Sequence, residues 1–368
     1  CLLACIEEAR TKNADILSGG ISGFTAAIQV SEHLYWVEKF SGLQFTVIFR
    51  KFFQAILNTD FGPTDAADYK LCSLTDNKFF IYPFISIQKD FGYSDATPKN
   101  NKAGIVKELF KRSEDKIEIL KNISQFYQKE RFTKCQNTNI ISSEGITIPT
   151  YVINLPERTE RRSHILQQFE GKDEFTVEII EACRHKIGAV GLWLSIKKVI
   201  ETAQKNDDNV IILCEDDHKF TQSYNRDLLL SNIVRSGGMG CNILSGGIGG
   251  FNMALPITEK LFWIDSFWCT QFIVIFKKFF QVILNEPFKE TDTADGKFSE
   301  MTSQKMVLYP FVSVQKDFGY SDVTIKNQKT RGLITQYFED ADKRLLKLQK
   351  TRERFNDLSF ENDLTCYK

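Results

Sequence analysis

The sequence predicts an α/β fold, a Rossmann-like mixed sheet with flanking helices, in which one complete domain follows a partial copy of itself. From Tyr151 onward, apolar strand-like runs alternate with charged helical patterns. This alternation is typical of βαβ units and favours a largely parallel sheet. The segment from Asp15 to Thr97 also aligns without a gap with the segment from Asn242 to Thr324. A repeat of this length indicates a duplicated half-domain rather than a short solenoid unit.

The length and composition of the chain favour some classes of protein and argue against others. A length of 368 residues allows two or three domains, and 42% hydrophobic with 26% charged residues is ordinary for a globular chain. A formal net charge of zero argues against a broad nucleic-acid-binding surface. Nine cysteines without CxxC pairs favour reduced thiols and a cytoplasmic location. No apolar run approaches the ~20 residues that span a bilayer, so amphipathic helices would give at most peripheral membrane contact.

The partial copy is predicted to occupy residues 1–130. Hydrophobic spacing distinguishes its helices from its strands, and Pro83 favours an edge or terminal position for the strand that contains it. We expect, in chain order, a helix end at 1–12, a short strand at 15–17, a buried helix at 44–57, a strand at 79–88 and a long amphipathic helix at 104–127.

Residues 131–148 are polar and lack periodicity, so we expect a linker there. The complete domain should span 149–355, followed by a tail at 356–368. Continuous apolar strands within it fit a sheet that is covered on both faces. We expect strands at 151–155, 175–180 and 209–214, and helices at 157–169, 191–205 and 331–354.

Three acids, Glu215, Asp216 and Asp217, directly follow the apolar strand of the complete domain. Ligands bind at the carboxyl ends of strands in open α/β sheets. Adjacent carboxylates repel one another, so they need a cation or strong hydrogen-bond donors nearby. Mg²⁺ or Mn²⁺ prefers such oxygen ligands and is often completed by phosphate oxygens. The alternative is an acidic loop that caps the next helix, because Asp is a good N-cap residue.

An arginine-rich turn follows the first strand of the complete domain, just after Asn154. Its members are Arg158, Arg161 and Arg162. Guanidinium groups pair well with phosphate or carboxylate, which would suit a nucleotide. A helix surface carrying Glu–Arg pairs is an equally good interpretation.

Three further features have two interpretations each. Asp295 could act as general base for an acceptor hydroxyl, or it could cap a helix or form a turn. His218 is expected to be a solvated loop residue rather than a metal ligand. The glycine-rich segment 245–250 is no P-loop, because no Gly-Lys-Ser/Thr follows, and it should allow close backbone approach or form a flexible lip.

Together these motifs resemble glycosyltransferase family 25, the family of lipopolysaccharide-type and collagen-type galactosyltransferases. The resemblance covers about Pro149 to Thr324. It departs from the family pattern at Ser195, which lacks a following His, and at Phe311, where a second Pro is common. The motifs that carry it, in order, are YVINLPERTERR, IGAVGLWLS, VIILCEDD, FWCTQFIVIFKKFFQVIL, TAD, and LYPFVSVQ followed by YSD.

The resemblance implies a GT-A fold and a reaction. A hexose, galactose or glucose, would pass from a nucleotide sugar, UDP-linked, to the hydroxyl of a glycan acceptor in lipopolysaccharide-type biosynthesis. Mn²⁺ or Mg²⁺ would be bound by Asp217 with Glu215. The remaining implied roles are nucleotide contacts by Asn154, Arg158, Arg162, Glu215 and Asp216, and proton abstraction by Asp295.

The duplication also suggests a rival function. A non-catalytic glycan-binding or scaffold protein could be built from degenerate glycosyltransferase domains, since the first copy lacks the acidic motif. We further expect Cys1 to lie inside a longer protein, with a second strand and acidic motif ahead of it. Another Mg²⁺-dependent nucleotidyl transferase is disfavoured, because the sequence has no Lys- or Arg-rich glycine loop.

Overall fold

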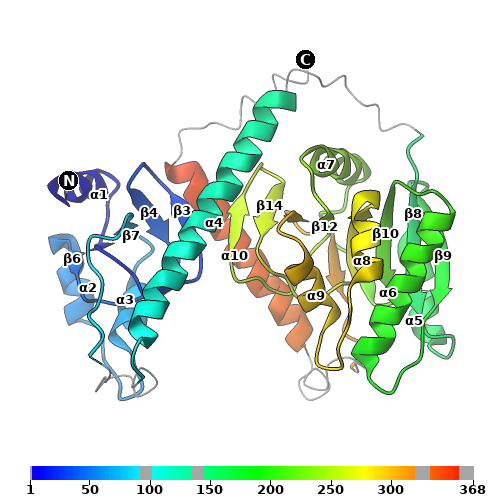
Figure 1. Ribbon diagram of the computed structural model, residues 1–368, viewed down its shortest axis with the longest axis horizontal. Coiled ribbons are helices and arrows are strands. Elements are labelled where there is room, and N and C mark those ends of the chain that lie inside the picture. Colours follow the sequence, from blue (N-terminus) through cyan, green and yellow to red (C-terminus); the bar gives the residue numbers. More distant parts are fainter. Residues whose placement is uncertain (1, 92–101, 135–144, 320–331, 356–368) are drawn as a thin grey trace. The chain divides into compact units, whose positions relative to one another are not determined.

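The computed structural model describes residues 2–91, 102–134, 145–319 and 332–355. The chain forms two compact units (Figure 1). Of the described residues, unit 1 contains 2–91, 102–126 and 350–355, and unit 2 contains 127–134, 145–319 and 332–349. Helix α4 (Ile105–Lys134) passes through the division and continues into the segment that was expected to be a linker.

Unit 2 is an α/β unit built on an eight-stranded mixed sheet. The strand order is β13-β14-β16-β12-β15-β10-β8-β9. The expectation of a largely parallel sheet is wrong, because β15 runs antiparallel to both β10 and β12 at the sheet centre. The strands are β8 (Ile148–Asn154), β9 (Phe175–Glu181), β10 (Val210–Glu215), β12 (Ile243–Ser245), β13 (Ala254–Pro256), β14 (Leu261–Ile264), β15 (Phe272–Phe276) and β16 (Lys305–Leu308).

Helices flank this sheet, and a short ribbon of β11 (His218–Phe220) and β17 (Ser313–Gln315) lies beside it. Helix α6 buries Trp193, Ile196 and Val199, and it contacts α8, beside which it lies in Figure 1. No helix among the described residues combines the length and apolar content that a bilayer crossing requires. The helices are α5 (Thr159–Phe169), α6 (Gly188–Lys205), α7 (Arg226–Gly238), η3 (Lys277–Phe279), α8 (Phe280–Asn285), α9 (Ala294–Met301) and α10 (Leu333–Phe355).

Unit 1 contains a five-stranded sheet in the order β3-β4-β7-β1-β6. Beside it, β2 (Gly23–Phe24) pairs with β5 (Phe40–Ser41). The five strands are β1 (Ile16–Ser18), β3 (Ala27–Gln29), β4 (Leu34–Val37), β6 (Thr46–Ile48) and β7 (Lys78–Ile81). The helices are α1 (Leu2–Thr11), η1 (Arg50–Phe52), α2 (Phe53–Leu57), α3 (Ala67–Leu74) and α4.

The two sheets repeat the same pairings in the same registers. Ile16 pairs with Ile48 in unit 1, and Ile243 pairs with Ile275 in unit 2. The strands β3, β4, β7, β1 and β6 therefore correspond to β13, β14, β16, β12 and β15. In each copy the corresponding strand, β7 or β16, ends just before a cis Tyr-Pro bond. The bond is Tyr82-Pro83 in unit 1 and Tyr309-Pro310 in unit 2. The aligned halves of the sequence thus adopt one strand arrangement twice.

Two sequence predictions about the repeated half differ from the structure. Residues 44–57 were expected to form one buried helix, but strand β6 occupies their first part and α2 is only a short helix. A short apolar run with β-branched residues does not distinguish a buried strand from a buried helix by periodicity alone. The strand expected at 79–88, in an edge or terminal position, is β7, which ends at Ile81 before Pro83 and lies between β4 and β1.

The glycine pairs that follow β1 and β12 allow close backbone approach, as predicted. A Cβ atom on Gly247 would lie 2.0 Å from the carbonyl oxygen of Ser313, and one on Gly20 would lie 2.0 Å from that of Ser86. Because the obstructing atom belongs to the backbone, no side-chain rotation can relieve the overlap. The glycines therefore let the segment after the cis Tyr-Pro bond pack directly against the end of the central strand.

We expect Gly247→Ala to lower the free energy of unfolding by roughly 1–3 kcal/mol, because overpacking displaces the backbone around Ser313. Chemical denaturation followed by tryptophan fluorescence measures the change. Gly62→Ala is the control, since its Cβ would meet only Asp65 Oδ2 at an ordinary 3.7 Å. Equal stability of the two variants would contradict the packing role assigned to Gly247.

Candidate functional site

The candidate site lies where several strand ends of unit 2 meet. Strands β8 and β10 are parallel neighbours, so their carboxyl ends, at Asn154 and Glu215, fall at the same edge of the sheet. Strand β15 is antiparallel to β10, which brings the residues before it, including Thr270, to the same edge. A cavity of about 860 Å³ opens there, and its walls include the acidic motif, the start of α5 and the start of α9.

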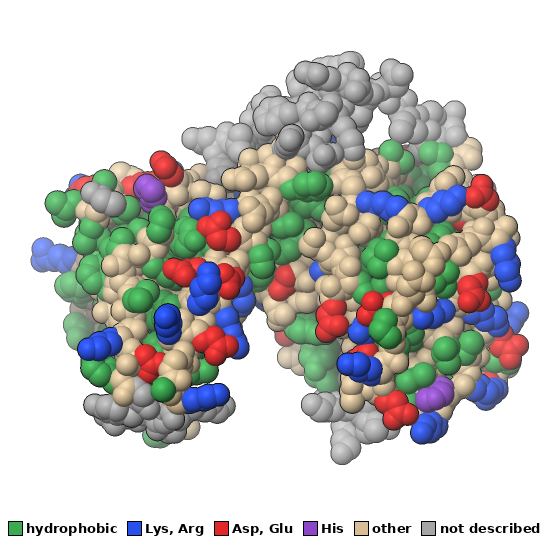
Figure 2. Space-filling view, in the orientation of Figure 1, with side chains coloured by type: hydrophobic (Ala, Val, Ile, Leu, Met, Phe, Trp, Pro, Cys, Tyr) green, Lys and Arg blue, Asp and Glu red, His purple; other side chains and the backbone are tan. Residues whose placement is uncertain are grey.

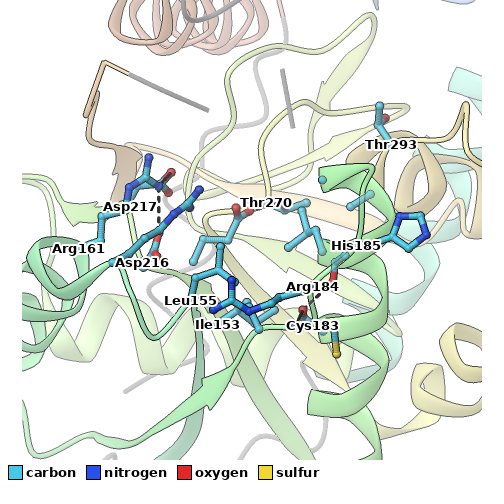
Figure 3. Close-up of a pocket in the computed structure, with 18 of the residues that line it drawn as sticks. Ile153, Leu155, Arg161, Cys183, Arg184, His185, Asp216, Asp217, Thr270 and Thr293 are labelled. Carbon is cyan, nitrogen blue, oxygen red and sulfur yellow. Dashed lines mark hydrogen bonds and ion pairs between the residues drawn. The ribbon is translucent and has the colours of Figure 1, made fainter. Parts of the chain in front are cut away.

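Within the acidic motif, Asp216 and Asp217 are buried and Glu215 is half-buried, and hydrogen-bond donors surround the carboxylates. Asp216 accepts from Asn154 Nδ2 at 2.9 Å through one oxygen and from Arg161 at 3.0 Å through the other. Asp217 Oδ2 accepts from Gln315 Nε2 at 2.7 Å and from Arg161 at 3.3 Å. Figure 3 shows Arg161 beside Asp216 and Asp217 at one end of the pocket. These bonds supply part of the compensation that three adjacent carboxylates require.

The negative charge of the three carboxylates is only partly compensated, and the pKa values of Glu215 and Asp217 are raised. Burial raises the pKa of Glu215 to about 8, with repulsion from Asp217 adding to the shift. Burial and repulsion from Asp216 raise the pKa of Asp217 to about 6, against the lowering effect of Arg161. Both carboxyl groups would therefore be easier to ionise if a further positive charge entered the pocket.

The carboxylate oxygens of the acidic motif can be compared with the ligands that a divalent cation requires. Asp217 Oδ1 is buried and has no hydrogen-bond partner, which suits a metal ligand. Both oxygens of Asp216 already accept bonds, and Glu215 Oε1 accepts from Thr270 Oγ1 at 2.5 Å. In the described part of the chain, no three His, Cys, Asp or Glu side chains group closely enough to hold a metal alone. The residues therefore fit a cation held by one or two carboxylates and completed by substrate oxygens and water.

The predicted arginines divide between two environments. Arg158 lines the pocket and helps to lower the pKa of Asp217. Arg162 is exposed on α5 and does not line the pocket, so the structure does not bring it to the predicted nucleotide site. The arginine that pairs with the acids is Arg161, which the sequence analysis left without a role. The helical spacing of the sequence could have indicated that Arg161 is buried. Arg161, Ile165 and Phe169 are four residues apart and form the buried face of α5.

Asp295 lines the pocket at the start of α9, but part of its role is structural. Its Oδ2 accepts from the backbone N–H of Cys269 at 3.2 Å, and Cys269 has a left-handed φ of 78°. Unit 1 contains the equivalent bond, from the N–H of Gly42 to Asp68 Oδ2 at 3.1 Å. Because the bond occurs in both units, it belongs to the repeated fold and does not by itself identify a catalytic base.

The opposite wall of the pocket was not predicted. Cys183, Arg184 and His185 lie there after β9, at the far end of Figure 3 from Asp217. Arg184 forms two hydrogen bonds with the Glu157 carboxylate, at 2.6 and 2.7 Å. One end of the pocket thus contains Asp216 and Asp217 paired with Arg161, and the other contains Arg184 paired with Glu157.

His218 is not the solvated loop residue that was expected. It is fully buried in strand β11 and packs among Phe169, Phe220 and Phe272. Its Nδ1 lies 2.7 Å from Ser313 Oγ. Burial lowers the pKa of the imidazole to about 3, which keeps the ring neutral at physiological pH. The predicted polar ending at Ser321-Asp322 lies outside the described residues.

Comparisons with known proteins add little. No protein-family model and no curated protein matches the chain. The crystal structure of A197 from STIV is similar at a TM-score of 0.33 and 12% identity, covering 47% of this chain and 86% of that one. The apo form of a UDP-glucose pyrophosphorylase is similar at a TM-score of 0.31 and 9% identity, covering 60% of this chain and 86% of that one. These scores are too low to carry an argument about function.

Arg161 and Arg162 provide a matched pair for testing the site. We expect Arg161→Met to lower the free energy of unfolding by roughly 3 kcal/mol or more, because buried carboxylates lose their charged partner. Arg162→Met should change it by no more than about 0.5 kcal/mol, as for an exposed side chain. Urea denaturation measures both. Similar losses in the two variants would show that the pairing with Asp216 and Asp217 is unimportant for stability.

Proposed function

We propose that unit 2 is a metal-dependent glycosyltransferase that takes a hexose from a UDP-sugar to a hydroxyl of a glycan. The observation that carries the proposal is the acidic motif at the carboxyl end of β10, which lines a large cavity and in which Asp217 Oδ1 is buried without a hydrogen-bond partner. Such a motif suits a cation bridged to a diphosphate. The family resemblance of the sequence motifs supports the same reaction.

Each pocket residue then has a chemical task. Asp217 would bind Mn²⁺ or Mg²⁺ together with Glu215, and Asn154 with Arg161 would hold Asp216 in place. The cation would supply positive charge to the leaving diphosphate. Arg158 would contact the nucleotide phosphates, because it lines the same cavity. Asp295 would take the proton from the acceptor hydroxyl in a single displacement.

The alternative is a glycan-binding or scaffold protein built from degenerate domains. The raised pKa values of Glu215 and Asp217 favour the enzyme, because an acidic cluster that only supports the fold gains nothing from being buried together. Calorimetric titration with UDP in the presence of Mn²⁺ separates the two: binding supports the enzyme, and none supports the scaffold.

We expect Asp217→Asn to abolish Mn²⁺-dependent UDP-sugar turnover and to weaken UDP binding in Mn²⁺ by about tenfold or more, a loss of ~1.4 kcal/mol. The amide keeps the shape of the side chain and the packing around it, so folding should persist. UDP release from a panel of UDP-sugars measures turnover, and calorimetry measures binding. Asp292→Asn, outside the pocket lining, is the control. Wild-type turnover in the Asp217 variant would exclude the metal role.

The repeated fold provides an internal control for Asp295. We expect Asp295→Asn and Asp68→Asn to reduce stability by similar small amounts, since each carboxylate holds the N–H of a left-handed residue. Only the Asp295 variant should lose turnover, by a factor of about 10² to 10⁴, the usual contribution of a general base. Turnover at saturating donor measures the difference. If the Asp295 variant turns over like wild type, its role is structural in both units.

A further inference from the structure

Two aromatic side chains of unit 2, Trp268 and Tyr337, are exposed although their neighbours in the chain are buried. Trp268 is 49% exposed, whereas the preceding Phe267 is 1% exposed. Tyr337 is 43% exposed, whereas the following Phe338 is 4% exposed. Single exposed apolar side chains are normal, and Figure 2 shows them scattered among charged ones on the face of unit 2 that carries α6 and α9. The support and the position of the two rings therefore decide whether they form a site.

The ring of Trp268 is held against the glycine-rich segment. Gly249 N–H donates to the carbonyl oxygen of Trp268 at 2.9 Å, and Trp268 N–H donates to that of Gly250 at 3.2 Å. A Cβ atom on Gly250 would lie 1.8 and 1.9 Å from the indole atoms Cε3 and Cζ3, so the six-membered ring lies directly against this glycine. Tyr337 borders the same segment, with its Cβ 3.6 Å from the position that a Cβ of Gly249 would occupy. Both aromatic side chains therefore flank the same two glycines.

Both side chains lie at the rim of the cavity that contains the acidic motif. Cys269, which follows Trp268, lines the cavity, and its N–H donates to Asp295 Oδ2 at 3.2 Å. Ile334 of α10 also lines the cavity, and Tyr337 is one helical turn further along the same side of α10. Asp295 is the group proposed to take the proton from the acceptor hydroxyl. The two aromatic side chains are thus next to the part of the cavity that an acceptor must enter.

The repeated fold does not require aromatic side chains at these two positions. Ser41 of unit 1 is the counterpart of Trp268, and its carbonyl oxygen accepts from Ser22 N–H at 2.9 Å, which repeats the backbone bond made to Trp268. Leu109 of α4 is the counterpart of Tyr337, counted from the glycine that precedes each helix. The same backbone arrangement therefore forms without an indole or a phenol, so packing alone does not account for the two rings.

We propose that Trp268 and Tyr337 form an acceptor subsite that binds a pyranose ring of the glycan by stacking. The C–H groups on the less polar face of a pyranose pack against the negatively polarised face of an aromatic ring, while the sugar hydroxyl groups stay solvated at the edge. A rigid aromatic side chain supplies this contact with little loss of conformational entropy. The subsite rests on the proposed function, since it would hold the acceptor hydroxyl beside Asp295, but stacking itself needs neither donor nor metal.

The test uses the full 368-residue chain without UDP or Mn²⁺ and takes lactose and maltotriose as probes. Saturation-transfer difference NMR should show transfer from aromatic protons of the protein to ring C–H protons of a saccharide. Trp268→Ser, which introduces the residue found at the equivalent position of unit 1, should weaken saccharide binding about tenfold or more. Trp268→Phe should retain most of the binding, because an aromatic face remains. Tyr69→Ser is the matched control, since Tyr69 is an aromatic side chain of unit 1 with 60% exposure.

Calorimetry with UDP and Mn²⁺ separates the subsite from the proposed function. Trp268→Ser should bind UDP like wild type, because Trp268 does not line the cavity. Saccharide binding through Trp268 without any UDP binding would refute the glycosyltransferase and keep the subsite as a glycan-binding one. UDP binding without saccharide binding, or equal saccharide binding by Trp268→Ser and Tyr69→Ser, would overturn the subsite. Sedimentation with phosphatidylglycerol vesicles that depends on Trp268, in place of saccharide binding, would identify a membrane contact and overturn it as well.

Discussion

The site in unit 2 depends on one buried arginine. Arg161 lies between Asp216 and Asp217, and all three side chains are almost fully enclosed. Burying charges costs several kcal/mol each, so such a cluster persists only when pairing and hydrogen bonds offset the desolvation. Asn154 and Gln315 add neutral donors, yet Glu215 and Asp217 still have raised pKa values. The arrangement holds the acids together but leaves their charge incompletely balanced, which is the electrostatic condition for attracting a cation.

The repeat separates what the fold needs from what the site needs. The glycine pair, the cis Tyr-Pro bond and the Asp that holds a left-handed residue occur in both units. The acidic motif, Arg161 and the wall that contains Arg184 lie ahead of the repeated segment, in residues that line the pocket of unit 2. Features of the first kind belong to the scaffold, so their presence near the pocket is weak evidence for chemistry. Features of the second kind carry the functional proposal.

The same comparison shows how neighbouring elements set the burial of a repeated position. Strand β6 and helix α2 keep the apolar character of β15 and α8 in unit 2. Phe53 of α2 is 49% exposed, whereas the equivalent Phe280 of α8 is fully buried. In unit 2, helix α6 packs on α8 and strand β10 pairs with β15. Equivalent positions in the two units therefore differ in burial because different described elements surround them.

The sequence by itself determined the repeat, the position of most of the helices and strands that it predicted, and the end of the strand that bears Glu215, because periodicity and turn residues act locally. The family resemblance grouped Asn154 with Asp216 as nucleotide-contacting residues, and in the structure Asn154 donates to Asp216 at 2.9 Å but does not line the pocket. The sequence misplaced the helix expected at residues 44–57, whose apolar run suits either structure. Only the tertiary structure selected Arg161 over Arg162, buried His218 in an aromatic cluster and assembled the wall that contains Arg184. Those outcomes depend on which side of a helix or loop faces the core, and residues distant in the sequence decide that.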